Sequence, residues 1–137
     1  MRHVLFDTNV LLDIFLRRAP HWHASAAVFD LAATGRVKGY VAGHAVTTIA
    51  YILEQEIGDK KTRAVITEAL SVLEVAAIDD SGIRAALQSP IAHFEDAVTE
   101  ISARRAGVSV VITRNTTDFA KSRVPALPPD AFVAGFA

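Results

Sequence analysis

Three aspartates are the side chains in this sequence best suited to do chemistry together. Asp7 directly follows a short apolar segment, Asp96 opens a segment with helical spacing, and Asp118 ends the polar stretch that begins at Thr113. Carboxylates gathered at one place repel one another and raise each other's pKa values, and a divalent cation removes that repulsion. Oxygen ligands suit Mg²⁺ or Mn²⁺, which can activate water and stabilise charge on a phosphate. If the three converge, the chemistry they imply is phosphodiester hydrolysis.

The elements that must position these residues alternate between strands and helices. β-Branched content and flanking turn residues predict strands at 3–6, 37–42, 72–78, 109–113 and 131–134. Helical spacing of apolar residues predicts helices around 10–15 and from 93 or 94 onwards, the latter ending near Gly107. Alternation of this kind favours an α/β fold with a mostly parallel sheet covered by helices on both faces, a three-layer arrangement. No linker or repeat interrupts it, so we expect a single domain over residues 1–137.

In parallel sheets of this class, ligands bind at the edge formed by the carboxyl ends of the strands. Asp7 follows the first predicted strand, and Asn115 and Asp118 follow the fourth. Asp96 lies in the first turn of the helix that leads into the fourth strand, and the N-terminus of that helix points back to the same edge. We therefore expect the three aspartates to converge on one pocket.

A purely structural interpretation of each acid remains open. Asp7, Thr8 and Asn9 are all good N-caps for a helix that begins near Val10. Asp118 can cap a turn, and Asp96 can complement a helix dipole. For any one acid the structural role is the simpler one, whereas their joint placement at one sheet edge favours a metal site.

Two segments then show a resemblance to a known family. The run Asp7-Thr-Asn-Val-Leu-Leu-Asp13 after an apolar strand resembles the opening motif of the PIN-domain family. The segments 96–103 and 107–119, which include Thr113-Arg-Asn-Thr-Thr-Asp118, resemble its C-terminal half, in the same order and over nearly the whole chain.

The resemblance implies a Rossmann-like α/β/α fold and cleavage of RNA that depends on Mg²⁺ or Mn²⁺. Many small prokaryotic members are ribonuclease toxins that pair with an antitoxin and form homodimers, so it also implies these partners. By position, Asp7 and Asp96 would be the principal metal ligands and Asp118 a third acid. The residues that would hydrogen-bond ligands, water or phosphate beside them are Asn9, Thr113 and Asn115.

The chain departs from the family pattern at one position. A second acid, most often Glu, is usual on the helix after the second strand, where this chain has Tyr51. Glu54 lies three residues on, on roughly the same helical face, and is a candidate replacement or a simple surface residue. The alternative function is therefore a catalytically weakened or inactive PIN-like module that binds RNA or protein.

Other polar residues near the expected pocket have less defined roles. His44 follows the second predicted strand and either reaches the acids, as a general acid or phosphate contact, or caps and packs against its helix. Glu100 shares the helical face of Asp96 and could deepen the acidic site, whereas we expect Glu95 to point to solvent.

Composition sets the remaining limits. The chain has no cysteine, which excludes disulfides and thiolate zinc sites, and its formal net charge of −1 gives no support to nucleic-acid binding. Small basic clusters such as Arg104-Arg105 and Lys60-Lys61 are usually solvated surface, with RNA contact as the functional alternative. No glycine-rich phosphate loop, nucleophile elbow, signal-peptide core or bilayer-length apolar segment is present, so we expect a cytoplasmic protein without a membrane partner.

Overall fold

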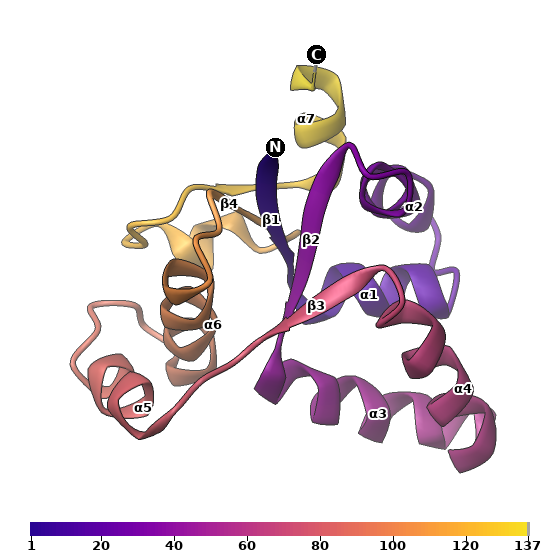
Figure 1. Ribbon diagram of the computed structural model, residues 1–137, viewed down its shortest axis with the longest axis horizontal. Coiled ribbons are helices and arrows are strands. Elements are labelled where there is room, and N and C mark those ends of the chain that lie inside the picture. Colours follow the sequence, from indigo (N-terminus) through magenta and orange to yellow (C-terminus); the bar gives the residue numbers. More distant parts are fainter. Residues whose placement is uncertain (137) are drawn as a thin grey trace.

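The computed structural model describes residues 1–136 as a five-stranded parallel sheet between layers of helices (Figure 1). Its strands are β1 (Arg2–Phe6), β2 (Val37–Ala42), β3 (Leu73–Ala76), β4 (Val110–Ile112) and β5 (Ala126–Leu127). They lie in the order β3-β2-β1-β4-β5, and every pairing is parallel. The predicted α/β class with helices on both faces of the sheet is therefore confirmed.

The helices form two groups on opposite sides of this sheet. On one side α1 (Thr8–Phe15) packs against α2 (Trp22–Ala33) and α3 (Gly43–Ile57), α3 packs against α4 (Asp59–Ala69), and α2 packs against α7 (Pro129–Gly135). On the other side α5 (Asp80–Leu87) packs against α6 (Phe94–Arg105) (Figure 1). None of the helices within residues 1–136 has the length and apolar character that a bilayer-spanning segment needs.

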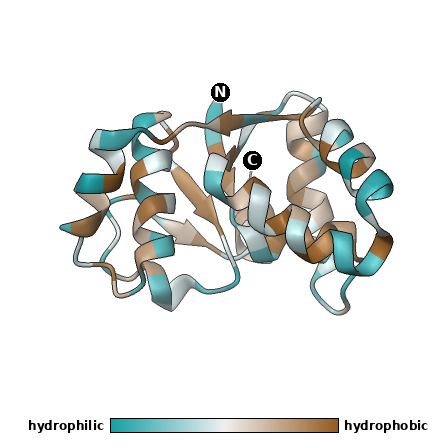
Figure 2. Ribbon diagram, turned by 90° about the horizontal axis from the view of Figure 1, so that it is seen from below, coloured by the Kyte–Doolittle hydropathy of each residue, from teal (hydrophilic) through white to brown (hydrophobic). Residues whose placement is uncertain are grey.

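The central strands are buried because helices cover both of their faces. The side chains of Val4, Leu5 and Phe6 in β1 and of Val111 and Ile112 in β4 are fully shielded from solvent. Figure 2 shows these apolar strands between helices whose outer faces are more hydrophilic. A run of consecutive apolar residues is the pattern expected of a parallel strand buried on both faces, and it fixes where β1 and β4 end.

The first four predicted strands are confirmed, with ends shortened by a few residues in β3 and β4. The fifth prediction, at residues 131–134, is wrong, because these residues belong to α7. Pro129 occupies the first turn of α7, where its fixed φ favours a helix, and Asp130 follows it in the same turn. The true fifth strand is only Ala126–Leu127, too short to show a two-residue alternation.

The predicted end of the helix near Gly107 is also confirmed. Gly107 has a φ of 78°, and its N–H donates to the carbonyl of Arg104 at 3.1 Å. The N–H of Val108 donates to the carbonyl of Ala103 at 2.9 Å, which completes a Schellman motif. The chain thus turns directly from α6 into the approach to β4.

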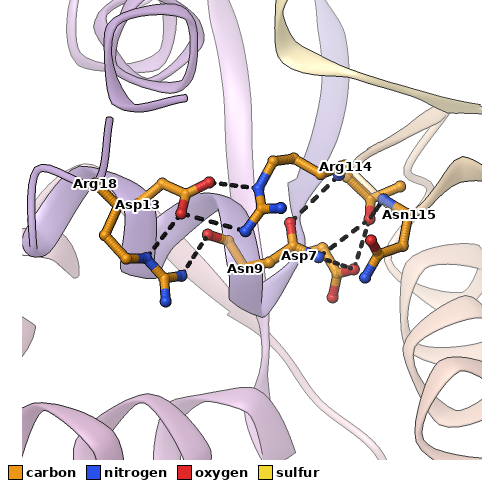
Figure 3. Close-up of polar contacts among 7 residues, drawn as sticks. Asp7, Asn9, Asp13, Arg18, Arg114 and Asn115 are labelled. Carbon is orange, nitrogen blue, oxygen red and sulfur yellow. Dashed lines mark hydrogen bonds and ion pairs between the residues drawn. The ribbon is translucent and has the colours of Figure 1, made fainter. Parts of the chain in front are cut away.

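A buried carboxylate joins the end of β4 to α1. The Asp13 side chain has no solvent exposure and accepts from Arg18 Nε at 2.9 Å and from Arg114 Nε at 2.6 Å (Figure 3). The two arginine side chains are 41% and 30% exposed, so their charges remain partly hydrated. One fully buried acid held by two cations fixes the segment after β4 against the helix that follows β1.

We expect Asp13→Asn to lower the free energy of unfolding by about 2 kcal/mol, because the amide leaves two arginines facing a neutral group in a buried setting. Glu74→Gln is the matched control, because Glu74 pairs with Lys38 at 3.4 Å on the surface and is 58% exposed. That control should change stability by less than about 0.5 kcal/mol. Urea unfolding with an unchanged m-value measures both, and equal losses would show that the Asp13 cluster is not a structural clamp.

Candidate active site

The junction between β1 and β4 builds the first half of the site. Phe6 and Ile112 are partners in the parallel ladder, so Asp7 and Thr113 leave the sheet side by side at its carboxyl edge. The backbone N–H of Asp7 donates to the carbonyl of Ile112 at 2.9 Å, and Thr113 Oγ1 donates to Asp7 Oδ2 at 2.8 Å. Thr113 is fully buried and Asp7 is 6% exposed. The sheet register therefore sets the position of the Asp7 carboxylate.

The other two predicted polar residues surround the same pair (Figure 3). Asn9 Nδ2 lies 3.4 Å from Asp7 Oδ2 and 3.5 Å from Thr113 Oγ1, which are long hydrogen bonds. The backbone N–H of Asn115 donates to Thr113 Oγ1 at 3.1 Å. Asn9 Oδ1 in turn accepts from the N–H of Arg114 at 3.3 Å. The structure thus brings Asp7, Asn9, Thr113 and Asn115 together as predicted.

Asp7 also has the capping role that the structural interpretation gave it. Its Oδ1 accepts from the N–H of Thr8 at 2.8 Å at the start of α1. Burial raises the pKa of Asp7 above its usual 3.8, and the hydrogen bonds from Thr113 and Thr8 act in the opposite direction. The negative charge of Glu95 adds to the increase, which places the start of α6 within electrostatic reach of Asp7.

Asp96 supplies the second half of the site from the first turn of α6. It is 8% exposed, and burial is the largest cause that raises its pKa from 3.8 to about 7. The charge of Glu95 and a hydrogen bond between the two carboxyl groups contribute next, followed by the charges of Asp7 and Asp118. Asp7 and Asp118 therefore lie within electrostatic reach of Asp96, although the three carboxylates form no ready-made group of metal ligands within residues 1–136.

Asp118 reaches the site from a 3-10 turn, Thr116–Phe119, that follows β4. Its backbone N–H donates to the carbonyl of Asn115 at 3.0 Å, which closes the turn. Its side chain is half-buried, and no hydrogen bond fixes its carboxylate among the described residues. Asp118 is thus the least constrained of the three aspartates.

The expectation that Glu95 points to solvent is confirmed, since its side chain is 54% exposed, but this side chain also contacts His44. Glu95 Oε1 lies 3.2 Å from His44 Nε2, and His44 Nε2 lies 3.3 Å from Thr99 Oγ1. The hydrogen bond with His44 is the largest cause that lowers the pKa of Glu95 below its usual 4.5. Glu95 is thus an exposed, ionised acid next to Asp96 at the start of α6. The signal in the sequence was the adjacent pair Glu95-Asp96 in the first turn of a helix.

His44 contacts the acidic site through Glu95, which agrees with the first of its two sequence interpretations, that it reaches the acids. It stands in the first turn of α3, directly after β2, and its side chain is 24% exposed. The other ring nitrogen, Nδ1, is buried and has no hydrogen-bond partner among the described residues. His44 therefore links the start of α3 to the start of α6 through Glu95 and Thr99.

Glu100 does not deepen the acidic site, although it shares a helical face with Asp96. Its carboxylate is buried, accepts from the N–H of Arg123 at 2.5 Å and lies 3.7 Å from Arg104 Nη1. These contacts direct it toward the segment after the 3-10 turn. The i, i+4 spacing placed it correctly on the helix but did not reveal its partners.

The position that departs from the family pattern lies outside the pocket. Tyr51 is 66% exposed on α3, and Glu54 is exposed beside Thr62 and Arg63 in a surface hollow between α3 and α4. Glu54 therefore does not replace the usual carboxylate. The fourth acid near Asp7, Asp96 and Asp118 is Glu95, which comes from a different helix.

The donor chemistry of the site fits a hard divalent cation. Within residues 1–136, no three Asp, Glu or His side chains form a ready-made group of metal ligands. Nevertheless, the raised pKa values of Asp7 and Asp96 show that negative charge is held there at a cost, which a bound Mg²⁺ or Mn²⁺ would lower. Asp7 and Asp96 are the residues best placed to hold such an ion, with Glu95 and Asp118 beside them.

Comparison with solved structures supports the fold. The chain is similar to a toxin–antitoxin complex from Klebsiella pneumoniae, with a TM-score of 0.71 and 22% identity over 92% of this chain and 97% of that one. It is similar to DNA-bound VapBC from Salmonella typhimurium, with a TM-score of 0.69 and 18% identity over 94% and 99%. For VapC20 from Mycobacterium tuberculosis the TM-score is 0.63 and the identity 16%, over 98% and 96%.

Sequence comparison is more specific, although no curated protein matches the chain. A family model described as PIN domain matches residues 3–117, which includes both halves of the site from Asp7 to Asn115. Because that match covers most of the sequence and the fold agrees, this chain belongs to the PIN-domain family.

Proposed function

We propose that this protein is a divalent-metal-dependent endoribonuclease that hydrolyses RNA phosphodiester bonds. The observation that carries the proposal is the convergence of Asp7 and Asp96, both with raised pKa values, at the carboxyl edge of a PIN-domain sheet. Perturbed carboxylates gathered at such an edge are typical of a catalytic site, and the capping bond from Thr8 to Asp7 does not account for the raised pKa of Asp96.

In this proposal Asp7 and Asp96 hold Mg²⁺ or Mn²⁺, with Asp118 as a third ligand or a ligand to bound water. When bound, the ion would supply an activated water and offset the charge that develops on the phosphate. Thr113 and Asn9 hold the Asp7 carboxylate in place, since both donate to its Oδ2. The N–H of Asn115 holds the Thr113 hydroxyl, which keeps that hydroxyl directed at Asp7.

Two further residues complete the proposed site. Glu95 adds a fourth carboxylate, and His44 keeps it ionised and oriented through the 3.2 Å contact. Thr99 bonds to the same ring nitrogen and also donates to the carbonyl of Glu95, so the contact belongs to a small network. This arrangement supports an active enzyme despite Tyr51, whereas the alternative is a weakened or inactive module that binds RNA or protein.

The biological role follows from the relatives. We propose a toxin that pairs with an antitoxin, forms a homodimer and acts on RNA in the cytoplasm. The supporting relatives include the Klebsiella pneumoniae toxin–antitoxin complex and VapC20, which is described as a toxin that cleaves the sarcin-ricin loop. Co-expression with the protein of any adjacent small reading frame, followed by size-exclusion chromatography, tests whether an antitoxin binds and whether the protein forms a homodimer.

Asp7→Asn and Asp96→Asn should each lower RNA cleavage in Mn²⁺ by more than about 100-fold, since loss of outer contacts to a metal ligand alone costs about 10–100-fold. Glu54→Gln should leave cleavage unchanged, because Glu54 lies on the surface between α3 and α4. The measurement is the initial rate on a labelled single-stranded oligoribonucleotide. Cleavage that survives in both aspartate variants would contradict the site, and its absence from the unsubstituted protein would favour the binding module.

Glu95→Gln distinguishes a fourth acid from a surface residue. Loss of this ionised carboxylate should weaken activation by Mn²⁺ and lower cleavage by about 10-fold or more. Glu54→Gln makes the identical chemical change on α3 and serves again as the control. A titration of rate against Mn²⁺ concentration measures the effect, and identical curves for the two variants would mean that Glu95 takes no part.

The raised pKa of Asp96 predicts a pH-dependent change in stability. Between its usual 3.8 and about 7, the folded protein binds a proton at this group that the unfolded chain has lost, so its contribution to stability falls as pH rises. Without metal, the free energy of unfolding of the unsubstituted protein should fall relative to that of Asp96→Asn as pH rises. The difference between the two proteins should change by on the order of 2 kcal/mol from about pH 5 to about pH 8.

Chemical denaturation at both pH values, without metal, measures this difference. Mn²⁺ should then stabilise the unsubstituted protein but not Asp96→Asn, because a ligand that binds only the folded state raises its stability. A stability difference that does not vary with pH would show that the Asp96 carboxyl group titrates normally.

A further inference from the structure

A basic cleft lies between α5, α6 and the segment after the 3-10 turn. Its volume is about 450 Å³. Arg104 and Arg105 line it from the last turn of α6, and Lys121 and Arg123 line it from the opposite segment. The only acid among its lining residues is Glu100. The cleft is therefore the part of the described surface where positive charge gathers around a cavity.

The positive charge of this cleft is only partly neutralised. Arg105 Nη1 pairs with Asp79 Oδ1 at 2.6 Å, and Arg104 lies 3.7 Å from Glu100, which is a loose ion pair. Lys121 and Arg123 are exposed and make no ion pair with any described residue. Two cations are thus left free to bind an anion.

The segment that carries these two cations is held in place before any ligand arrives. Glu100 is buried and accepts from the N–H of Arg123 at 2.5 Å. The Ser122 hydroxyl donates to the carbonyl of Val124 at 2.7 Å and accepts from the N–H of Val124 at 3.0 Å. A backbone fixed in this way loses little entropy when its side chains bind a ligand.

The cleft lies further along α6 than the acidic site. Glu100 lies one helical turn after Asp96, a displacement of about 6 Å along the axis, and Arg104 lies one turn further. On the other side of the cleft, Lys121 follows Asp118 by three residues. The acids thus occupy the N-terminal end of α6 and the arginines its C-terminal end. The segment after β4 reaches α6 at two points, since the charge of Asp118 acts on Asp96 and the N–H of Arg123 donates to Glu100.

We propose that this cleft binds backbone phosphates of the RNA next to the bond that is cut, with Lys121 and Arg123 as the principal contacts. The inference rests on the proposed ribonuclease function. A polyanion that approaches several carboxyl groups needs compensating positive charge nearby, and the cleft supplies it one to two helical turns away. Ser89 and Gln88 add polar groups to the lining, which suits phosphate and sugar oxygens.

The test compares two double variants that remove the same charge. Lys121→Gln with Arg123→Gln changes the cleft, whereas Lys60→Gln with Lys61→Gln changes α4, in the opposite helical layer (Figure 1). Fluorescence anisotropy with a labelled single-stranded oligoribonucleotide, in EDTA to prevent cleavage, gives Kd over a series of salt concentrations. Unfolding curves of both double variants confirm that each is folded.

The cleft variant should bind RNA about 10-fold more weakly, and its slope of log K against log salt should fall by about 1.4, or 0.7 for each lost phosphate contact. In Mn²⁺ its KM should rise while kcat stays constant, because the contact is the same in the ground and transition states. The α4 variant should match the unsubstituted protein in every measurement.

Three results would overturn the proposal. The first is equal weakening in both double variants, which would reflect net charge alone, and the second is unchanged RNA binding in the cleft variant. The third is a cleft variant that still binds RNA but no longer binds polyglutamate, used as a model of an acidic protein. That result would assign the cleft to an acidic protein partner. Absence of cleavage by the unsubstituted protein would count against the nuclease function instead, while the anisotropy measurement would still decide the role of the cleft.

Discussion

The buried carboxylate of Asp7 is the constraint on which the rest of the site depends. A charged group at 6% exposure must be satisfied by fixed donors, and α1 and the end of β4 together supply three of them. The start of α1 provides the N–H of Thr8, the end of β4 provides the Thr113 hydroxyl, and Asn9 provides an amide. Because Thr113 reaches Asp7 only if β1 and β4 are neighbours in register, the sheet order β2-β1-β4 is a condition of the site. The short segment after β4 holds two acids. The Thr113 hydroxyl donates to Asp7, and the guanidinium of the next residue, Arg114, donates to the buried Asp13.

The second half of the site differs in the neighbours of its carboxylate. Burial is the largest cause that raises the pKa of both Asp7 and Asp96, but hydrogen bonds oppose this increase at Asp7, whereas the charge of Glu95 adds to it at Asp96, where the pKa rises to about 7. The adjacent Glu95 is kept ionised by His44, so each additional negative charge near Asp96 makes its own ionisation more costly. The repulsion between these neighbouring carboxylates opposes the ionisation of Asp96 in the folded protein, which is the reason to interpret the pair as functional.

Much of this organisation could be predicted from sequence, for identifiable reasons. The apolar runs of β1 and β4 predict where these strands end. Because ligands bind at the carboxyl ends of parallel strands, this is enough to predict that Asp7, Asp96, Thr113 and Asn115 lie at one edge of the sheet. The failures came where a contact depends on tertiary neighbours rather than on local pattern. Glu95 meets His44 because the starts of α3 and α6 face each other, and neither residue's spacing along the chain reveals that contact. For Glu100, helical spacing correctly predicts the helical face that it shares with Asp96. Its carboxylate nevertheless accepts from the backbone N–H of Arg123, a tertiary contact that the spacing does not reveal. The fifth strand could not be predicted because a two-residue strand has no periodicity. The residue types of Ala131-Phe-Val-Ala134 favour a strand, but Pro129 starts a helix there instead.

The distribution of charge resolves a difficulty that composition alone presented. A net charge of −1 gives a nucleic-acid enzyme no general attraction for its substrate, yet the described structure separates its charges along α6. Acids at the N-terminus of that helix and arginines at its C-terminus each complement the helix dipole, so this separation adds stability to α6. The acidic end suits a cation and the basic end suits phosphate, and the two ends are about 15 Å apart at 1.5 Å per residue, a distance that a few nucleotides can span. In the proposed site, Glu95 on α6 would take the place of the acid that is missing at Tyr51 on α3. Helix α3 then contributes His44, whose Nε2 lies 3.2 Å from Glu95 Oε1.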